Sequence, residues 1–148
     1  MISLSKYNQD INIISFFNNK KDLYFVDICG YYGNWFSNTI LLETKYNWTG
    51  ICSELFPEIF ETIKQHRTVK CYNYYLFSKS GLSLKLNNSH LSSARNTSIG
   101  VTSYLQRLKN ITDNVNEITV KTITLQDLLD KCNTPKIIHY LSLDTEKT

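Results

Sequence analysis

The segment LYFVDICGYYGNWFSNT, residues Leu23–Thr39, decides the fold class of this chain. It begins with a continuous apolar run, Leu23–Ile28, that is interrupted only by Asp27. Such a run suits a strand that is buried on both faces, as in a parallel sheet. Gly30 and Gly33 follow and mark a turn. A strand that ends in a carboxylate beside a turn of small residues is typical of the nucleoside pocket in doubly wound α/β domains.

Helical and strand patterns alternate after this turn. Ser37 can cap a helix that runs to about Tyr46, and Thr49–Ser53 then has the pattern of a second strand. Pro57 suits the first position of the next helix, and Val69–Phe77 follows as a third strand. The succession strand, helix, strand, helix, strand predicts parallel strands joined by right-handed crossovers.

The pattern is less regular in the second half of the chain. Gly81–Gly100 is polar and is expected to be partly loop, whereas Tyr104–Lys109 is a candidate for a short helix. Ile118–Thr122 alternates and could be a strand. Thr124 opens a clear helix through a capping-box pattern. Ile137–Leu143 is then expected to be the fourth core strand.

Length and composition restrict the class of protein. With 148 residues the chain is one domain at most, and 42% hydrophobic residues are enough for a core. The net charge of +3 comes from scattered basic residues, which argues against nucleic acid as the main partner. No apolar stretch approaches the roughly 20 residues of a membrane span, and the N-terminus lacks a signal-peptide pattern. A cytoplasmic protein is therefore expected.

The four cysteines do not form a recognisable metal or redox motif. Cys29, Cys52, Cys71 and Cys132 are far apart, with no C-x-x-C pair and no histidine at ligand spacing. The favoured interpretation is four buried thiols in a reducing compartment. No metal site is therefore predicted.

Further carboxylates fall at the expected strand tips. Glu54 lies roughly 20 positions after Gly33, where an acid reaches ribose hydroxyls in nucleotide-binding folds. The alternative for Glu54 is a solvated loop acid. Asp144 and Glu146 end the fourth strand, where a carboxylate could orient a substrate or accept its proton. Asp144 is the first candidate for this base and His90 a distant second. The alternative for the pair is two exposed acids near a frayed terminus.

Several of these segments occur together in a known family. The chain resembles the FkbM family of S-adenosylmethionine-dependent methyltransferases over roughly Leu23–Glu146. The matching text is FVDICGYYG, SNT, LLE, WTGICSELFPEIF, HRTVKCYN, TITLQDLLD and PKIIHYLSLDTE. The ordered combination of FVDI, SNT, WTGI and LSLDTE is far more specific than any glycine pattern.

The resemblance implies a fold and a set of site residues. The fold would be α/β, a Rossmann-like methyltransferase with an open parallel sheet of core order 3-2-1-4 that lacks the last strands. Residues 1–22 would form an N-terminal segment and residues 23–148 a partial domain of this kind. The implied cofactor is S-adenosylmethionine. The implied roles are Asp27, Gly30 and Gly33 in the cofactor turn, Glu54 on the ribose, Asn73 near the adenine, and Asp144 and Glu146 at the methyl-transfer end.

Methyl transfer to an oxygen nucleophile is the expected function, because members of the family are associated with O-methylation of small molecules or sugars. The main alternative is a shortened relative, weakly active or inactive, that binds a ligand or partner without turnover. A nicotinamide-dependent oxidoreductase is disfavoured, because CGYYG has Cys29 in place of the first glycine of G-x-G-x-x-G. Cys29 also departs from the FkbM pattern, which usually has glycine there.

The outer edge of the fourth strand, Ile137–Leu143, raises a further question. No later strand exists in this chain to pair with it, and an unpaired apolar edge exposes backbone groups. Three outcomes stay open: self-association through this edge, cover by the N-terminal segment Ile11–Phe17, or marginal stability. Ile118–Thr122 is a weaker candidate for cover. Association or poor stability is expected.

Overall fold

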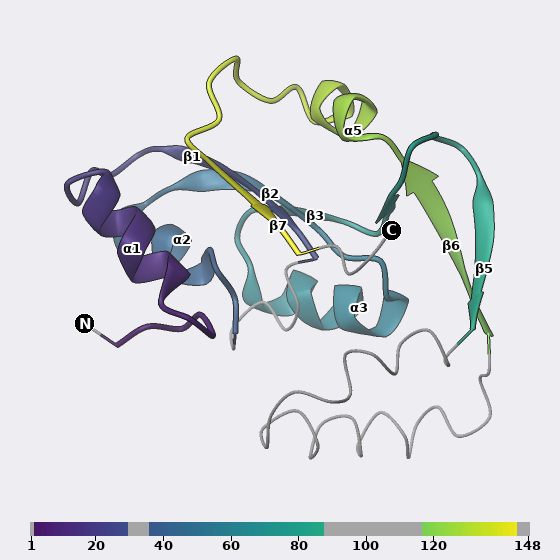
Figure 1. The fold of residues 1–148 in the computed structure, drawn as a ribbon, viewed down its shortest axis with the longest axis horizontal. Helices are drawn as coiled ribbons and strands as arrows, with labels where there is room; N and C mark the ends of the chain where they lie inside the picture. Colours follow the sequence, from purple (N-terminus) through teal and green to yellow (C-terminus); the bar gives the residue numbers. More distant parts are fainter. Residues whose placement is uncertain (1, 30–35, 88–116, 145–148) are drawn as a thin grey trace. The chain divides into compact units, whose positions relative to one another are not determined.

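The structure is a computed structural model that describes residues 2–29, 36–87 and 117–144 (Figure 1). The chain divides into two compact units. The first unit consists of Met1–Leu82 together with Lys121–Thr148, and the second consists of Ser83–Val120. The first unit contains the segments that the sequence predicts to form the parallel sheet.

A parallel four-stranded sheet is the centre of the first unit. Its strands are β1 (Tyr24–Ile28), β2 (Thr49–Ser53), β3 (Lys70–Tyr72) and β7 (Tyr140–Leu143). They lie in the order β3-β2-β1-β7, and each neighbouring pair is parallel. Because β7 is the fourth core strand expected from the sequence, the α/β fold class and the order 3-2-1-4 are confirmed.

Helices cover both faces of this sheet. Figure 1 shows α1 (Gln9–Phe16), α2 (Ile40–Tyr46) and α3 (Pro57–His66) on one side and α5 (Leu125–Lys131) on the other. This is the layering of an open α/β sheet, in which crossover helices shield the apolar strands from water.

Alternation along β1 explains why its sequence is apolar except at Asp27. Phe25 is fully buried in a cluster with Ile14 of α1 and Leu42 of α2. Its neighbour Val26 points to the opposite face and packs in a cluster with Leu128 of α5. A strand that is buried on both faces has no position at which a solvated side chain is favoured. This explains the apolar run, and Asp27, which alone interrupts it, is itself buried.

Three predicted helix starts have the expected chemistry. Pro57 is at the first turn of α3, and the Thr124 hydroxyl accepts from the amide of Asp127 at 3.1 Å at the start of α5. The helix expected after Ser37 begins at Ile40 instead. Ser37 still contributes to this start, because its hydroxyl accepts from the Ile40 amide at 3.2 Å.

The predicted third strand, Val69–Phe77, is wrong as a single element. It is divided into β3 and a short strand β4 (Tyr75–Leu76), which pairs in parallel with β6 (Glu117–Ile123) in a second sheet. Asn73 lies between the two strands, and its side-chain amide donates to backbone carbonyls after β2. These carbonyls therefore bond a side chain rather than a continued β3, and the chain leaves the first sheet.

The remaining predicted elements have mixed outcomes. The expected strand Ile118–Thr122 is confirmed as part of β6. β5 (Ser83–Asn87) was not predicted, since its sequence falls within a segment expected to be partly loop, and it neighbours β6 in the second sheet. The candidate helix Tyr104–Lys109 lies outside the described residues.

The N-terminal segment packs on a face of the sheet. Ile14 of α1 is buried in the cluster that includes Phe25, and the Phe17 ring lies edge-on to Trp48 at 5.5 Å and to His139 at 5.9 Å. Within the described ranges, β7 pairs with β1 alone. Neither α1 nor β6 therefore supplies a strand beside the outer edge of β7.

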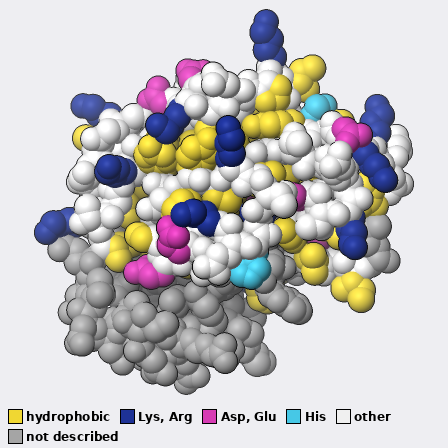
Figure 2. All heavy atoms as spheres, turned by 180° about the vertical axis from the view of Figure 1, so that it is seen from behind, with side chains coloured by type: hydrophobic (Ala, Val, Ile, Leu, Met, Phe, Trp, Pro, Cys, Tyr) yellow, Lys and Arg dark blue, Asp and Glu magenta, His cyan; other side chains and the backbone are white. Residues whose placement is uncertain are grey.

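Two observations concern the surface and the membrane. On the face shown in Figure 2, lysine and arginine side chains are dispersed rather than gathered into one patch. None of the helices in the described part of the chain has the length and apolar character needed to cross a bilayer.

Candidate functional site

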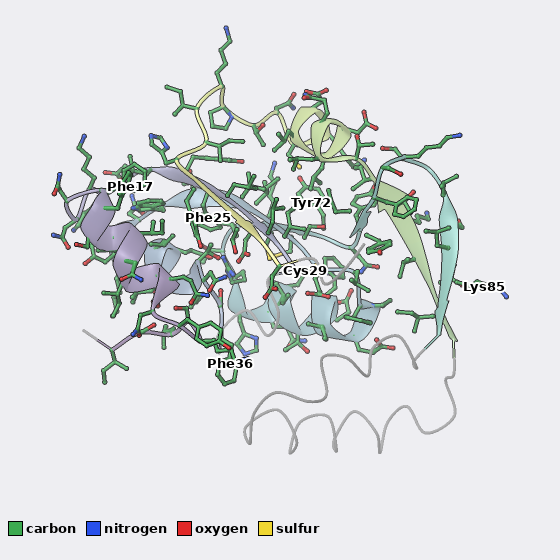
Figure 3. The ribbon with its side chains drawn as sticks, in the orientation of Figure 1. Phe17, Phe25, Cys29, Phe36, Tyr72 and Lys85 are labelled. Carbon is green, nitrogen blue, oxygen red and sulfur yellow. The ribbon has the colours of Figure 1, made fainter. Side chains whose placement is uncertain are left out.

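The carboxyl ends of the four parallel strands bring four residues to one edge of the sheet. Cys29, Glu54, Asn73 and Asp144 each directly follow a strand of this sheet. The register joins the last residues of β1, β2, β3 and β7 in successive pairs. Figure 3 shows Cys29 at the end of β1. Ligands of open α/β sheets bind outside this edge, which makes it the candidate site.

Backbone hydrogen bonds continue the strand pairing into these tip residues. The Cys29 amide donates to the Ser53 carbonyl at 2.7 Å, and the Glu54 amide donates to the Tyr72 carbonyl at 2.9 Å. The Asp144 amide donates to the carbonyl at the end of β1 at 3.2 Å. The tip residues are thus held by the sheet itself rather than by loops.

Glu54 is buried at the tip of β2. Its side chain is 3% exposed, and Oε1 accepts from the amide of Phe56 at 3.1 Å. The alternative of a solvated loop acid is therefore wrong. A buried carboxylate at this strand tip has the chemistry needed to accept hydrogen bonds from a pair of vicinal hydroxyls.

Asn73 ties the tips of β2 and β3 together. Its Nδ2 donates to the Glu54 carbonyl at 2.7 Å and to the Leu55 carbonyl at 3.0 Å. It lies just after β3 rather than within the third strand, where the sequence placed it. Asn73 therefore helps to fix the backbone position of Glu54.

Asp27 lies beneath the strand tips rather than at them. The residue is 2% exposed, and its Oδ2 accepts from the Thr39 hydroxyl at 2.5 Å. The nearest cation is the guanidinium of Arg67, with Nη1 3.7 Å from Oδ2. Burial raises the pKa of Asp27 above its usual value, although the Arg67 charge and hydrogen bonds from Thr39 and Ser142 oppose this rise.

Arg67 is the centre of a buried polar cluster that sequence reasoning missed. It follows α3, its Nε donates to Glu43 at 2.6 Å, and its Nη2 donates to the Thr39 hydroxyl at 2.7 Å. Nη1 is 3.3 Å from the Ser37 hydroxyl. Because Asp27 also contacts it, Arg67 connects the end of β1 with the start of α2.

Glu43 is the closer ionic partner of Arg67. Its second carboxylate oxygen accepts from the Thr68 amide and hydroxyl and from the Val69 amide. Burial alone would raise the pKa of Glu43, but the charge of Arg67 and the hydrogen bonds from Thr68 hold it below its usual value. Glu43 therefore carries the negative charge that balances Arg67.

One sequence signal does indicate such a cluster. A carboxylate inside a run that is buried on both faces needs a buried donor or cation. Asp27 meets this description, but the chain has 16 lysines and arginines, and nothing in their spacing singles out Arg67. The partner is set by the fold.

The residues on either side of the segment between Cys29 and Phe36 are fixed by hydrogen bonds. Cys29 has φ of 63°, in the left-handed region that favours glycine. After the segment, Ser37 and Thr39 contact Arg67. The backbone on both sides of the predicted cofactor turn is thus fixed by the sheet and by the buried cluster.

Some predicted site residues cannot be placed on this geometry. Gly30, Gly33, Glu146 and His90 lie outside the described residues. Asp144 is exposed, and its backbone is bonded to the end of β1. The structure therefore brings Glu54 and Asn73 together, with Asp144 at the same edge and Asp27 below it. In the described ranges no group of three or more His, Cys, Asp or Glu residues could hold a metal ion.

The arrangement of strands and tip carboxylates agrees with a comparison against known families. A model of the methyltransferase FkbM domain matches residues 27–148. This chain belongs to the FkbM methyltransferase family. No curated protein and no solved structure matches the chain.

The FkbM domain begins, in this match, at the buried Asp27 and includes every tip residue described above. The family resemblance predicted from the sequence is therefore confirmed. The general chemistry of the chain is methyl transfer, and its parallel sheet is consistent with a Rossmann-like methyltransferase fold. A nicotinamide-dependent oxidoreductase loses its support.

Proposed function

We propose that this FkbM domain transfers a methyl group from S-adenosylmethionine to a hydroxyl oxygen of a small molecule or sugar. The observation that carries the proposal is the buried carboxylate of Glu54 at the tip of β2, within a methyltransferase domain. Carboxylates at this position hold ribose hydroxyls in nucleotide-binding folds. A hydrogen-bond acceptor at this position thus fits the ribose of a nucleoside cofactor.

Each residue has a proposed part in holding this cofactor. Glu54 would accept from the ribose hydroxyls, and Asn73 would lie on the adenine side while it supports the Glu54 backbone. Asp27 would act indirectly, because its carboxylate is hydrogen bonded within the Arg67 cluster. Gly30 and Gly33 would allow the backbone to approach the bound cofactor.

The methyl-transfer end is assigned to Asp144 and Glu146. When bound, the cofactor supplies an activated methyl group on a sulfonium centre. The chain contributes by holding the acceptor hydroxyl in line with this methyl and by removing its proton. Asp144 is the first candidate for the base, since its backbone is fixed beside the end of β1.

One observation supports a second candidate function. Cys29 places a side chain, in a left-handed conformation, where FkbM domains usually have glycine. A side chain there would hinder close approach of a cofactor to the backbone. The second candidate is therefore a weakly active or inactive methyltransferase-like domain that binds its ligand without turnover. A turnover assay with a competent hydroxyl acceptor separates the two candidates.

Calorimetric titration with S-adenosylmethionine tests the cofactor assignment. We expect Glu54→Gln to weaken binding by about 1.5–3 kcal/mol, a factor of roughly 10–150, because it removes a charge-assisted acceptor. Glu58→Gln is the matched control, since Glu58 is an exposed acid of the adjoining α3. Equal affinities of the parent and the Glu54 variant would reject the ribose assignment, and preferential binding of NAD would reject the proposed cofactor.

A further inference from the structure

Two cysteines that are far apart in the sequence lie opposite each other in the sheet. Cys52 of β2 is the register partner of Cys71 of β3. Neighbouring strands are separated by about 4.8 Å, which lies within the range of about 4.4–6.8 Å that disulfides span between Cα atoms. Both side chains face α3, where they pack with Ile59 and Ile63. Strand pairing alone therefore places the Cα atoms of the two cysteines within the range that a disulfide requires.

The two thiols are reduced and have different environments. Cys52 is fully buried, whereas Cys71 is partly exposed and its thiol donates to the Val69 carbonyl at 3.5 Å. Hydrogen bonding from the Cys52 thiol and the nearby charge of Arg67 lower the pKa of Cys71, although its partial burial and the charges of Glu43 and Asp27 oppose this shift. The pKa of Cys52 is raised. Cys71 is thus the reactive, accessible member of the pair, and Cys52 is its protonated neighbour.

We propose that Cys52 and Cys71 form an oxidation site, at which a peroxide closes a disulfide between β2 and β3. The Cys71 thiol first releases its proton, and the resulting thiolate attacks one oxygen of hydrogen peroxide. The O–O bond breaks, a sulfenic acid and hydroxide form, and the hydroxide takes up the released proton to become water. The sulfur of Cys52 then attacks the sulfur of Cys71, the S–O bond breaks, and the hydroxyl leaves as water with the Cys52 proton. Two thiols are oxidised, and one peroxide is reduced to two waters.

The disulfide would change the relative positions of the residues at the ends of β2 and β3. Glu54 and Asn73 each lie two residues after one of the cysteines, and the Asn73 side chain bonds the Glu54 backbone. A disulfide draws its Cβ atoms to about 3.8 Å, closer than paired positions of neighbouring strands normally lie. The cross-link would therefore shift the two tips relative to each other. That this alters cofactor binding rests on the proposed function.

Peptide mapping of the whole chain tests the disulfide directly. The reduced protein is treated with hydrogen peroxide, its remaining thiols are alkylated, and it is digested with trypsin without reductant. Cleavage after Lys64, Arg67 and Lys70 separates the two cysteines. We expect a linked pair of peptides, two hydrogens lighter than their sum, that dithiothreitol separates.

Variants identify the atoms involved. Cys71→Ser should abolish the linked peptide, whereas Cys132→Ser should leave it unchanged because Cys132 lies in a different cluster. Alkylation of Cys52 after peroxide treatment, a linkage to another cysteine, or over-oxidation of Cys71 without a cross-link would each overturn the proposal.

Binding of S-adenosylhomocysteine tests the effect on the tips. We expect oxidation of the parent chain to weaken its binding of S-adenosylhomocysteine several-fold, and dithiothreitol to restore the affinity. Oxidation of the Cys71→Ser variant should leave its affinity unchanged. Equal affinities of the reduced and cross-linked protein would overturn this coupling. Absence of binding by the reduced protein would instead speak against the proposed function, while the peptide map still decides whether the disulfide forms.

Discussion

At the scale of single residues, the buried cluster near the site contains more acidic than basic side chains. One cation, Arg67, faces two carboxylates, Asp27 and Glu43. The pKa of Glu43 is lowered and that of Asp27 is raised, so the cluster favours one ionised acid over two. This asymmetry has a measurable consequence for stability.

The Glu43 charge should contribute to stability at neutral pH. Because folding lowers its pKa, this contribution is complete above the usual glutamate pKa of roughly 4.3 and is lost as pH falls through the folded value. The raised pKa of Asp27 acts in the opposite sense, since deprotonation costs stability as pH rises. We expect Glu43→Gln to lower the free energy of unfolding at pH 7 by about 1.5–3 kcal/mol and to flatten the acid limb.

Urea denaturation between pH 3 and 7 is the measurement for this prediction. Glu61→Gln is the matched control, since Glu61 is an exposed acid of α3 paired with Lys64. Asp27→Asn should cost less stability at pH 7 than Glu43→Gln. An acid limb of unchanged slope in Glu43→Gln would contradict the assignment of the charge to Glu43.

Asp144 should affect chemistry more than binding. Its backbone is fixed beside the end of β1, and its side chain is exposed at the edge where the acceptor is expected. Under the proposed function, Asp144→Asn should lower turnover by a factor of roughly 100–10,000, because a general base is lost. Steady-state kinetics with a competent acceptor, beside calorimetry of cofactor binding, checks this. A variant with the parental rate would remove Asp144 from the mechanism.

At the scale of elements, the close approach of β1 and β2 depends on a residue without a side chain. Gly50 of β2 is the register partner of Phe25. A Cβ at Gly50 would meet the Phe25 backbone carbonyl and would lie 2.8 Å from its ring atom Cδ2. Phe25 is fully buried and cannot move aside without disturbing the core beneath α2.

We therefore expect Gly50→Ala to destabilise the sheet. Overpacking of this kind costs about 1–3 kcal/mol in the free energy of unfolding. Thr49→Ala is the control, since Thr49 is the exposed neighbour in the same strand. Chemical denaturation measures both variants. A Gly50 variant as stable as the parent would show that the β1–β2 pair adjusts without cost.

Predictability also differs among the elements. The predicted bounds of the second strand, Thr49–Ser53, are those of β2. A short apolar run between turn signals leaves little freedom in where a strand begins and ends. The start of α5 follows from a local capping pattern, because the Thr124 hydroxyl accepts a hydrogen bond from the Asp127 amide three positions later. The division of Val69–Phe77 was not predictable, because it depends on bonds from Asn73 to the backbone after β2, which no local pattern encodes.

At the scale of the whole molecule, the free edge of β7 is the prominent feature. Leu141 and Leu143 of this strand are 40% and 51% exposed, and within the described residues only β1 pairs with it. An apolar edge with unpaired backbone groups can pair with a second copy of itself. We therefore propose that the chain associates through this edge.

Sedimentation over a range of concentrations tests the association. We expect concentration-dependent self-association that the double variant Leu141→Lys and Leu143→Lys reduces, because charge on an edge strand opposes pairing. Ile137→Lys is the matched control, since Ile137 is an exposed apolar residue that precedes the strand. A parent chain that stays monomeric at all concentrations would contradict this proposal.

The sequence by itself determined the main helix starts and, through the motifs that resemble FkbM domains, the family and the strand order of the sheet. These features depend on local periodicity, capping residues and short motifs, whose physical causes act within a few positions of the chain. Glu54 could be proposed as a site residue for the same reason, since a strand tip is a local position.

Only the tertiary structure decided which distant side chains meet. The bond between Asn73 and the Glu54 backbone, the burial of Arg67 between Asp27 and Glu43, and the pairing of two cysteines all depend on strand register and helix packing. Register is set by the cooperative fit of a whole face of the sheet. Spacing along the chain carries no information about such pairs, so they appear only when the chain is folded.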